Sequence, residues 1–267
     1  MSRSRKQIEM LSRPWSFWLF ERMAPLARFK LTKALIPGFR DEGLNISVLP
    51  INEGIEAPGD TPLPIQLLEG FITDASHRVL VDHCPCRNAL DCRRYPHEIG
   101  CLMMGEAALE ISPSVGREIS VEEALEHAHK AVDAGLVPMV GKARVDNIVF
   151  GIRDKKRLLS CCFCCECCCI SRFARHVPAD KRANNVVRLA GLRLEVSDEC
   201  DGCGACVKRC FLQELKVVDG RAVIPVGCAG CGRCATVCKK GAISLHLDDP
   251  AFVQEARERI GALAKYQ

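Results

Sequence analysis

The spacing of apolar residues predicts helices and short strands in the first half of the chain. Residues 44–49 alternate between apolar and polar side chains, as a half-buried strand does, and residues 77–82 form a second strand-like segment. Residues 51–60 are rich in Gly, Pro and acidic residues, so a loop is expected there. A helix is expected to begin at Thr61 and Pro62, because apolar residues then recur on one side: Ile65, Leu67, Leu68, Phe71 and Ile72.

A second helix is predicted from Ser120 to Gly135. Ser120 and Glu123 have the spacing of a capping box, and glycine commonly ends a helix. Residues 136–140 and 145–152 follow as strand-like segments. Alternation of helices with short strands is typical of an α/β arrangement, so we expect a cysteine-rich α/β domain in this part of an α+β protein.

The last third of the chain has a different order of expected elements. Residues 216–224 have the composition of a strand, a turn and a strand, with Asp219-Gly220 at the turn. Residues 242–245 suit a further strand, and a helix of mixed charge is expected from Pro250 onward. We therefore divide the chain into a helical segment (1–40), an α/β cysteine-rich domain (41–190), a third domain (191–247) and a C-terminal helix (248–267).

The N-terminal segment contains a short apolar run, Pro14 to Phe20, between basic residues. This run is too short to span a membrane, and no cleavage site of a signal peptide follows it. Two interpretations stay open. The favoured one is a helix packed on its own domain; the other is an amphipathic helix that touches a membrane surface or a membrane-bound partner.

Cysteine content changes the picture more than any other feature of composition. The chain has 267 residues and 19 cysteines, an odd number with several adjacent pairs. This does not resemble a disulfide framework, and soft thiolate ligands for metals require a reducing compartment. We therefore expect a cytoplasmic protein of an anaerobic or low-oxygen cell.

Residues 200–238 contain the most specific motif. The pattern Cys-x2-Cys-x2-Cys-x3-Cys occurs twice, separated by 17 residues. Zinc sites usually show two separated pairs of cysteines, whereas a triplet followed by one more cysteine is typical of [4Fe–4S] ligation. The eight residues are Cys200, Cys203, Cys206 and Cys210, then Cys228, Cys231, Cys234 and Cys238.

This segment resembles the bacterial two-cluster ferredoxins. The resemblance implies two [4Fe–4S] clusters in a ferredoxin-like domain, with the last cysteine of each motif crossing to the other cluster. It implies that Cys238 completes the first site and Cys210 the second. The family commonly has proline after each fourth cysteine, where this chain has Phe211 and Lys239. Over residues 60–245 the order of motifs also resembles uncharacterised multi-cluster 4Fe–4S binding proteins of anaerobes.

A second group of cysteines lies at residues 84–101. Its spacing is Cys-x-Cys-x5-Cys-x8-Cys, which offers enough thiolates for one further iron–sulfur cluster. Alternatives are a structural zinc, or free cysteines without a metal. The residues are Cys84, Cys86, Cys92 and Cys101.

The third group, which we call the cysteine run, places seven cysteines in nine residues. Adjacent side chains point in different directions, so one metal cannot take all seven; some must reach a second site, bridge several metals or stay free. Iron–sulfur ligation is the simplest hypothesis beside a ferredoxin-like segment, and a zinc or copper cluster is the alternative. The residues are Cys161, Cys162, Cys164, Cys165, Cys167, Cys168 and Cys169.

These motifs favour an electron-transfer protein, in which two [4Fe–4S] clusters exchange single electrons with one or two further iron–sulfur clusters of unknown type. The alternative is an iron–sulfur reductase whose catalytic cluster is built on residues 161–169. A third hypothesis is storage or delivery of iron or zinc by the cysteine run. The sequence shows neither a nucleotide-binding glycine loop nor a flavin fingerprint, so any catalysis would depend on a cluster.

Charge indicates the kind of partner. Residues 200–240 contain seven Lys or Arg and three acidic residues, which favours an acidic redox partner, although an ordinary solvated surface explains the same charges. No basic patch is combined with base-stacking aromatic residues, so we expect no nucleic-acid partner.

Overall fold

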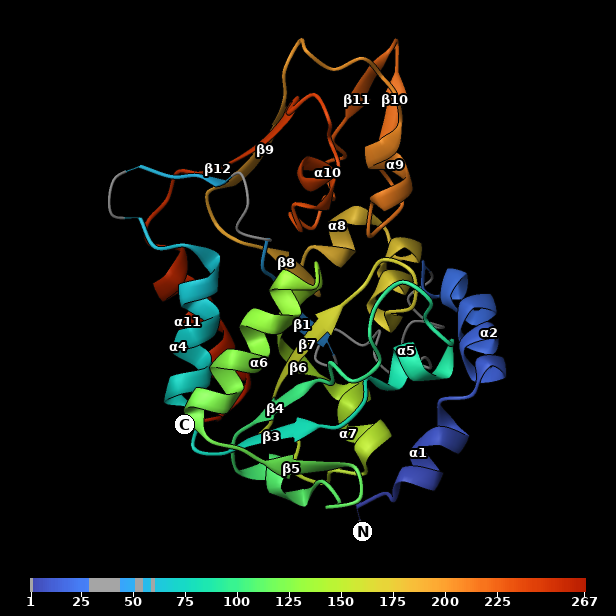
Figure 1. Ribbon diagram of the computed structural model, residues 1–267, viewed down its shortest axis with the longest axis vertical. Coiled ribbons are helices and arrows are strands. Elements are labelled where there is room, and N and C mark those ends of the chain that lie inside the picture. Colours follow the sequence, from blue (N-terminus) through green and yellow to red (C-terminus); the bar gives the residue numbers. More distant parts are fainter. Residues whose placement is uncertain (1, 29–43, 51–54, 59–60) are drawn as a thin grey trace.

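The computed structural model describes residues 2–28, 44–50, 55–58 and 61–267 (Figure 1). It is a mixed α+β protein built around a seven-stranded sheet with the strand order β5-β3-β4-β7-β6-β1-β8. In the same order, the strands are Gly116–Glu118, Arg78–Val81, Leu102–Met104, Leu159–Cys164, Val137–Ala143, Leu44–Val48 and Val186–Arg188.

The sheet is predominantly antiparallel. Within the described residues, five of its six strand pairings are antiparallel, and only β1 and β8 run parallel. The expected α/β alternation is therefore not the arrangement of this sheet. Helix α7 (Arg144–Phe150) and the loop after it join β6 to β7, yet these two strands pair antiparallel, so this helix is not the crossover of a parallel βαβ unit.

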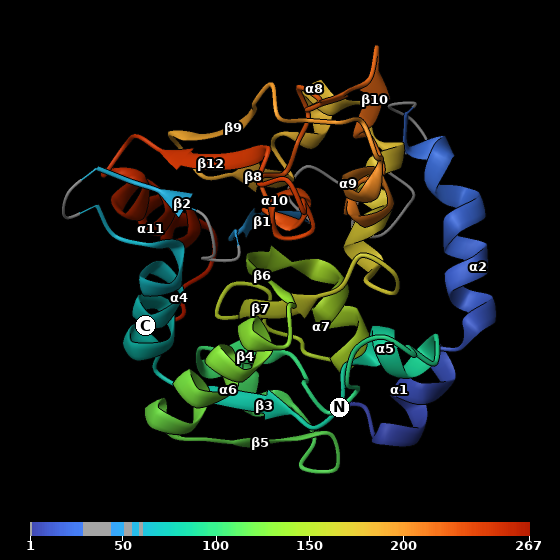
Figure 2. The same cartoon turned by 45° about the horizontal axis from the view of Figure 1, so that its top comes forward.

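Helices cover both faces of the sheet (Figures 1 and 2). Helices α4, α6 and α11 share one apolar core with Val140, Leu159 and Cys161. On the other face, α1 and α7 pack near β3 and β4, while α2 and α5 share a smaller cluster with Phe173. The bounds are α1 Arg5–Leu11, α2 Pro14–Met23, α4 Pro64–Asp74, α5 Pro85–Ala89, α6 Val121–Asp133, α7 Arg144–Phe150 and α11 Phe252–Leu263.

Strand β7 separates two environments. Side chains alternate along a strand, so Cys161 and Phe163 enter the core under α4, α6 and α11, whereas Cys162 and Cys164 face the opposite side. Neighbouring residues of the cysteine run are therefore directed to different faces of the sheet.

Most of residues 192–247 form a smaller layer (upper part of Figure 1). Strand β12 (Ile243–Leu247) pairs with β9 (Leu192–Val196) and with β2 (Ile55–Glu56). Asp219 and Gly220 both have positive φ, 48° and 76°, which is the geometry of a tight hairpin turn. The remaining elements are α8 Ala179–Arg182, α9 Ala205–Arg209, α10 Arg233–Thr236, β10 Lys216–Val218, β11 Arg221–Val223, and the 3-10 helices η1 Ala24–Arg28, η2 Glu106–Glu110 and η3 Ile170–His176.

Most elements expected from the apolar pattern are confirmed, including the helix capped by Ser120, whose hydroxyl accepts a hydrogen bond from the Glu123 N–H at 3.2 Å. Two expectations are wrong. Residues 145–152 are helical over Arg144–Phe150, because Val145, Ile148 and Val149 also recur at helical spacing. The expected loop at 51–60 includes strand β2, which pairs with β12. Residues 51–54 and 59–60 of this loop lie outside the described residues.

The N-terminal helices pack on the protein itself, as the favoured interpretation expects. Phe17 is buried, and the Phe20 ring lies 5.0 Å from the Phe173 ring. Trp15 and Trp18 nevertheless remain 59% exposed. None of the helices in the described part of the chain is long and apolar enough to cross a membrane. Contact with a membrane or partner through this surface stays a prediction, and residues 29–40 of the expected helical segment lie outside the described residues.

Candidate metal centres

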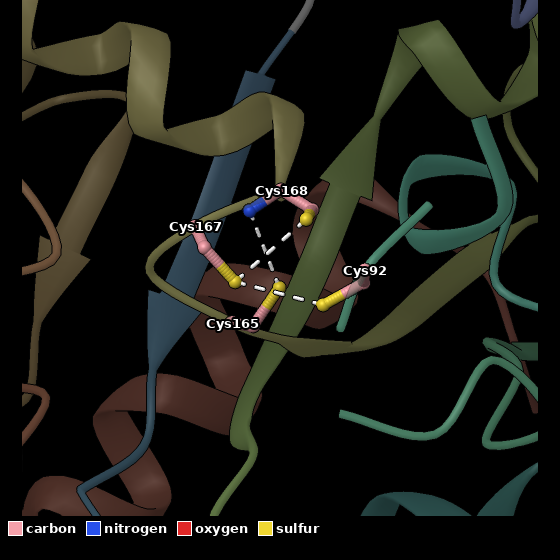
Figure 3. A group of neighbouring side chains, drawn as sticks. All are labelled: Cys92, Cys165, Cys167 and Cys168. Carbon is pink, nitrogen blue, oxygen red and sulfur yellow. Dashed lines mark hydrogen bonds between the residues drawn. The ribbon is translucent and has the colours of Figure 1, made fainter. Parts of the chain in front are cut away.

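Four cysteines form a compact group, which we call the four-cysteine site (Figure 3). Cys92 follows helix α5, and Cys165, Cys167 and Cys168 lie in the turn after strand β7. Their sulfur atoms all lie within 4.8 Å of one another. Cys92 Sγ is 3.6 Å from Cys167 Sγ, and Cys168 Sγ is 3.7 Å from Cys167 Sγ.

These separations fit one tetrahedral metal ion. Metal–sulfur bonds of about 2.3 Å in a tetrahedron place the sulfurs about 3.8 Å apart. The ligands of a cubane bind four different irons, so their sulfurs lie farther apart. The hydrogen bond between Cys167 and Cys165 lowers the pKa of Cys165 and raises the pKa of Cys167, so Cys165 is the member of the pair that favours the thiolate form. The four-cysteine site can therefore hold zinc or a single iron.

Glu166 lies inside the cysteine run and is itself buried, with 5% of its side chain exposed. Its carboxylate accepts a hydrogen bond from the Tyr95 hydroxyl at 3.1 Å. Burial by itself would raise the pKa of Glu166, but the Arg233 guanidinium, with further arginines, holds the pKa below its ordinary value. The ion pairs of this carboxylate, with their N–O distances, are Arg94 2.7 Å, Arg209 2.9 Å and Arg233 3.0 Å.

Glu166 thus connects the four-cysteine site to the C-terminal third of the chain. Arg209 directly precedes Cys210, and Arg233 directly precedes Cys234. Arg233 is buried and also donates to the Tyr95 hydroxyl at 2.7 Å. Two ion pairs therefore fix the position of the cysteine run relative to two cysteines of the repeated Cys-x2-Cys-x2-Cys-x3-Cys motifs.

The eight motif cysteines line two cavities. Cys200, Cys203, Cys206 and Cys238 line one of about 320 Å³, which we call the outer site because Cys203 is exposed. A second, narrower cavity of about 20 Å³, the inner site, lies beside Phe211 and Ala229. The cysteines that line the inner site are Cys210, Cys228, Cys231 and Cys234.

The loops of the two sites have matching backbones. Gly202 and Gly204 have φ values of 67° and 72°, and Gly230 and Gly232 have 74° and 76°. Gly230 has the left-handed backbone conformation that favours glycine, and a Cβ there would also lie 2.6 Å from Leu192 Cδ2. Backbone N–H groups already point at sulfur: Gly230 donates to Cys228 Sγ at 3.4 Å, which is how such loops stabilise bound clusters.

The structure divides the eleven upstream cysteines differently from their order in sequence. Cys92 joins the cysteine run, whereas the other cysteines of residues 84–101 lie elsewhere. Cys161 is fully buried in the core, and burial raises the pKa of its thiol. The six others line a further cavity, which Cys165 of the four-cysteine site also borders, and they are called the six-thiol site: Cys84, Cys86, Cys101, Cys162, Cys164 and Cys169.

Two of the basic residues at positions 200–240, which were expected to form a surface for an acidic partner, have structural roles instead. Arg209 and Arg233 pair with Glu166, so they do not contribute to an exposed basic face, while Lys239 and Lys240 are exposed beside the outer site. Sequence reasoning missed Glu166 as an anchor. One signal was present, because it is the single acidic residue among seven cysteines.

No protein-family model, curated protein or solved structure matches the chain. The chain is cysteine-rich and contains a four-cysteine group able to hold a metal. The resemblance to two-cluster ferredoxins rests on motif spacing.

Proposed function

We propose that the protein is an iron–sulfur electron-transfer protein with two [4Fe–4S] clusters in a ferredoxin-like segment, coupled to further metal centres on the upstream cysteines. One observation carries this proposal: each of two cavities is lined by three cysteines of one motif and the last cysteine of the other. That crossed set is the one the ferredoxin motif requires. A [4Fe–4S] cluster supplies reversible one-electron transfer when bound.

The surroundings of the two sites suggest different roles. The outer site has an exposed cysteine, Cys203, and two exposed lysines, Lys239 and Lys240. Positive charge beside an exposed redox site attracts an acidic partner and speeds encounter at low salt. The inner site lies next to buried Arg233 and the cysteine run. The outer site therefore suits exchange with a partner protein, and the inner site suits exchange within the chain.

A reductase is the second candidate, and a specific observation favours it. The six-thiol site borders a cavity of about 280 Å³ whose walls include apolar residues such as Phe17, Ile46 and Met139. A cavity with apolar walls and a few polar groups is the usual form of a small-molecule site. In this alternative the ferredoxin-like segment delivers electrons to chemistry at residues 161–169.

The proposal is tested on full-length protein purified without oxygen. We expect the dithionite-reduced protein to show the EPR signals of reduced [4Fe–4S] clusters, with about eight irons assigned to residues 200–238. Cys238→Ser and Cys210→Ser should each remove the signal of one site and leave the other. Each should lower the iron content by about four.

Cys161→Ser is the matched control, since its thiol lies in the apolar core away from every cavity described above. This variant should keep both ferredoxin signals. Zinc in place of iron at residues 200–238, or clusters that do not reduce reversibly, would contradict the proposal.

A further inference from the structure

Six cysteines from four parts of the chain line a single cavity on one side of strand β7. Cys84 and Cys86 lie at the start of helix α5, and Cys101 precedes strand β4. Cys162 and Cys164 come from β7, and the backbone before η3 supplies the last member, Cys169. Cys165 also lines this cavity, and its thiol is hydrogen-bonded to Cys167 in the four-cysteine site.

The six thiols form a series of neighbours. Cys84 lies within hydrogen-bonding reach of Cys86 and of Cys101. Cys101 reaches Cys162, and Cys162 reaches Cys164. Cys169 Sγ then lies 2.8 Å from Cys164 Sγ, and negative charge on Cys169 also acts on the Cys86 thiol. Each of these sulfurs is close to one or two of the others, but among the described residues no three of the six lie all within 4.8 Å of one another, as the sulfurs of the four-cysteine site do.

A buried cation accompanies this group. Arg87 is 1% exposed, and its guanidinium donates to the backbone carbonyls of Pro96 at 2.9 Å and Phe163 at 2.7 Å. It is close enough to interact with charge on Cys84 and Cys101. A fixed positive charge of this kind offsets the negative charge that several thiolates bring into an apolar interior.

Asp146 and Ser160 also line this cavity, and Ser160 is 2% exposed. Their side chains lie close enough to interact with each other, so together they contribute a polar patch to the wall of the cavity.

The number of thiols decides what this group is. One tetrahedral ion takes four thiolates, and one cubane also takes four. Six thiols around one cavity exceed both. We propose that the six-thiol site binds a polynuclear iron–sulfur cluster with more thiolate ligands than a cubane, on the opposite side of β7 from Cys161.

The position of the six-thiol site suits an acceptor of electrons from the inner site. This role rests on the proposed electron-transfer function. Cys231 of the inner site packs against the apolar cluster that contains Cys164 and Cys169. Arg233 donates to the Cys164 carbonyl at 3.4 Å. The inner ferredoxin-like site and the six-thiol site are therefore adjacent.

The test counts iron and acid-labile sulfide in full-length protein that has been reconstituted anaerobically with ferrous iron and sulfide. We expect the double variant Cys162→Ser/Cys164→Ser to lose about four or more irons with a matching amount of sulfide. Cys165→Ser/Cys168→Ser should lose about one metal ion and no sulfide. Cys161→Ser, on the same strand but facing the other side, should lose neither.

Two outcomes overturn the proposal: wild-type protein with about nine or fewer irons, or a Cys162→Ser/Cys164→Ser variant that keeps its iron and sulfide. Loss of metal without sulfide would also overturn it, because the site would then hold metal ions alone. Cys86→Ser, at a partly exposed position, supplies the same comparison should the double variant fail to fold. Unchanged ferredoxin EPR signals in these variants separate this result from failure of the electron-transfer proposal.

Discussion

Replacing Glu166 by glutamine should destabilise the protein without changing its shape. The change keeps the size of the side chain and removes one buried negative charge. Arg94 is 54% exposed and can turn to solvent, and Arg209 is 28% exposed. Only 3% of the Arg233 side chain is exposed, so Arg233 cannot turn to solvent and would remain buried without its counter-charge. The cost of the substitution therefore arises mainly at Arg233.

The magnitude follows from that burial. Removing one partner of a buried ion pair costs about 3–5 kcal/mol. Glutamine keeps one carbonyl oxygen as an acceptor, which recovers about 1 kcal/mol. We expect a net loss of about 2–4 kcal/mol in the free energy of unfolding. For a chain of this size that lowers the midpoint of thermal unfolding by roughly 10 °C.

Thermal unfolding of the anaerobic holoprotein, followed by circular dichroism, measures this shift, with metal content determined for each variant. Glu106→Gln is the matched control, because Glu106 and Arg157 form a pair whose side chains are 57% and 48% exposed. Removing that exposed pair should cost about 0–1 kcal/mol. Equal shifts for the two variants would refute the argument that Glu166 is an electrostatic anchor.

Other substitutions test separate parts of the structure. Arg87→Lys should lower the free energy of unfolding, measured in urea, by about 3 kcal/mol and should also reduce the iron content. The reason is that one ammonium cannot replace a guanidinium that donates to three carbonyls. An unchanged iron content would contradict a role of Arg87 in charge compensation. Gly141→Ala should cost more than about 3 kcal/mol, since a Cβ there would lie 2.1 Å from the Asn45 carbonyl oxygen of β1. Gly261→Ala, where a Cβ meets nothing within 4 Å, should instead stabilise helix α11 by about 0.5–1 kcal/mol in the same assay. Ser120→Ala should cost about 1 kcal/mol through loss of the helix cap and leave metal content unchanged.

Local sequence predicted local structure well where one pattern acted alone. The Ser120 cap, the hairpin turn at Asp219-Gly220 and the apolar face of α4 follow from side-chain chemistry within a few residues. The segment 145–152 did not, because β-branched residues suit both a strand and one face of a helix. Its helical form ends at Gly151, which adopts φ 73°.

The sequence by itself identified the candidate thiolate ligands and the repeated spacing of the eight motif cysteines. Only the tertiary structure decided how the eleven upstream cysteines are grouped. Strand alternation sends Cys162 and Cys164 to one side of β7, and the turn beyond the strand carries Cys165, Cys167 and Cys168 to Cys92, which lies far earlier in the chain. Metal ligands are selected by distance in space, and the sequence carries no direct measure of the distance between two loops. Glu166 illustrates the same physical reason, since its value as an anchor depends on arginines that only the folded chain brings beside it.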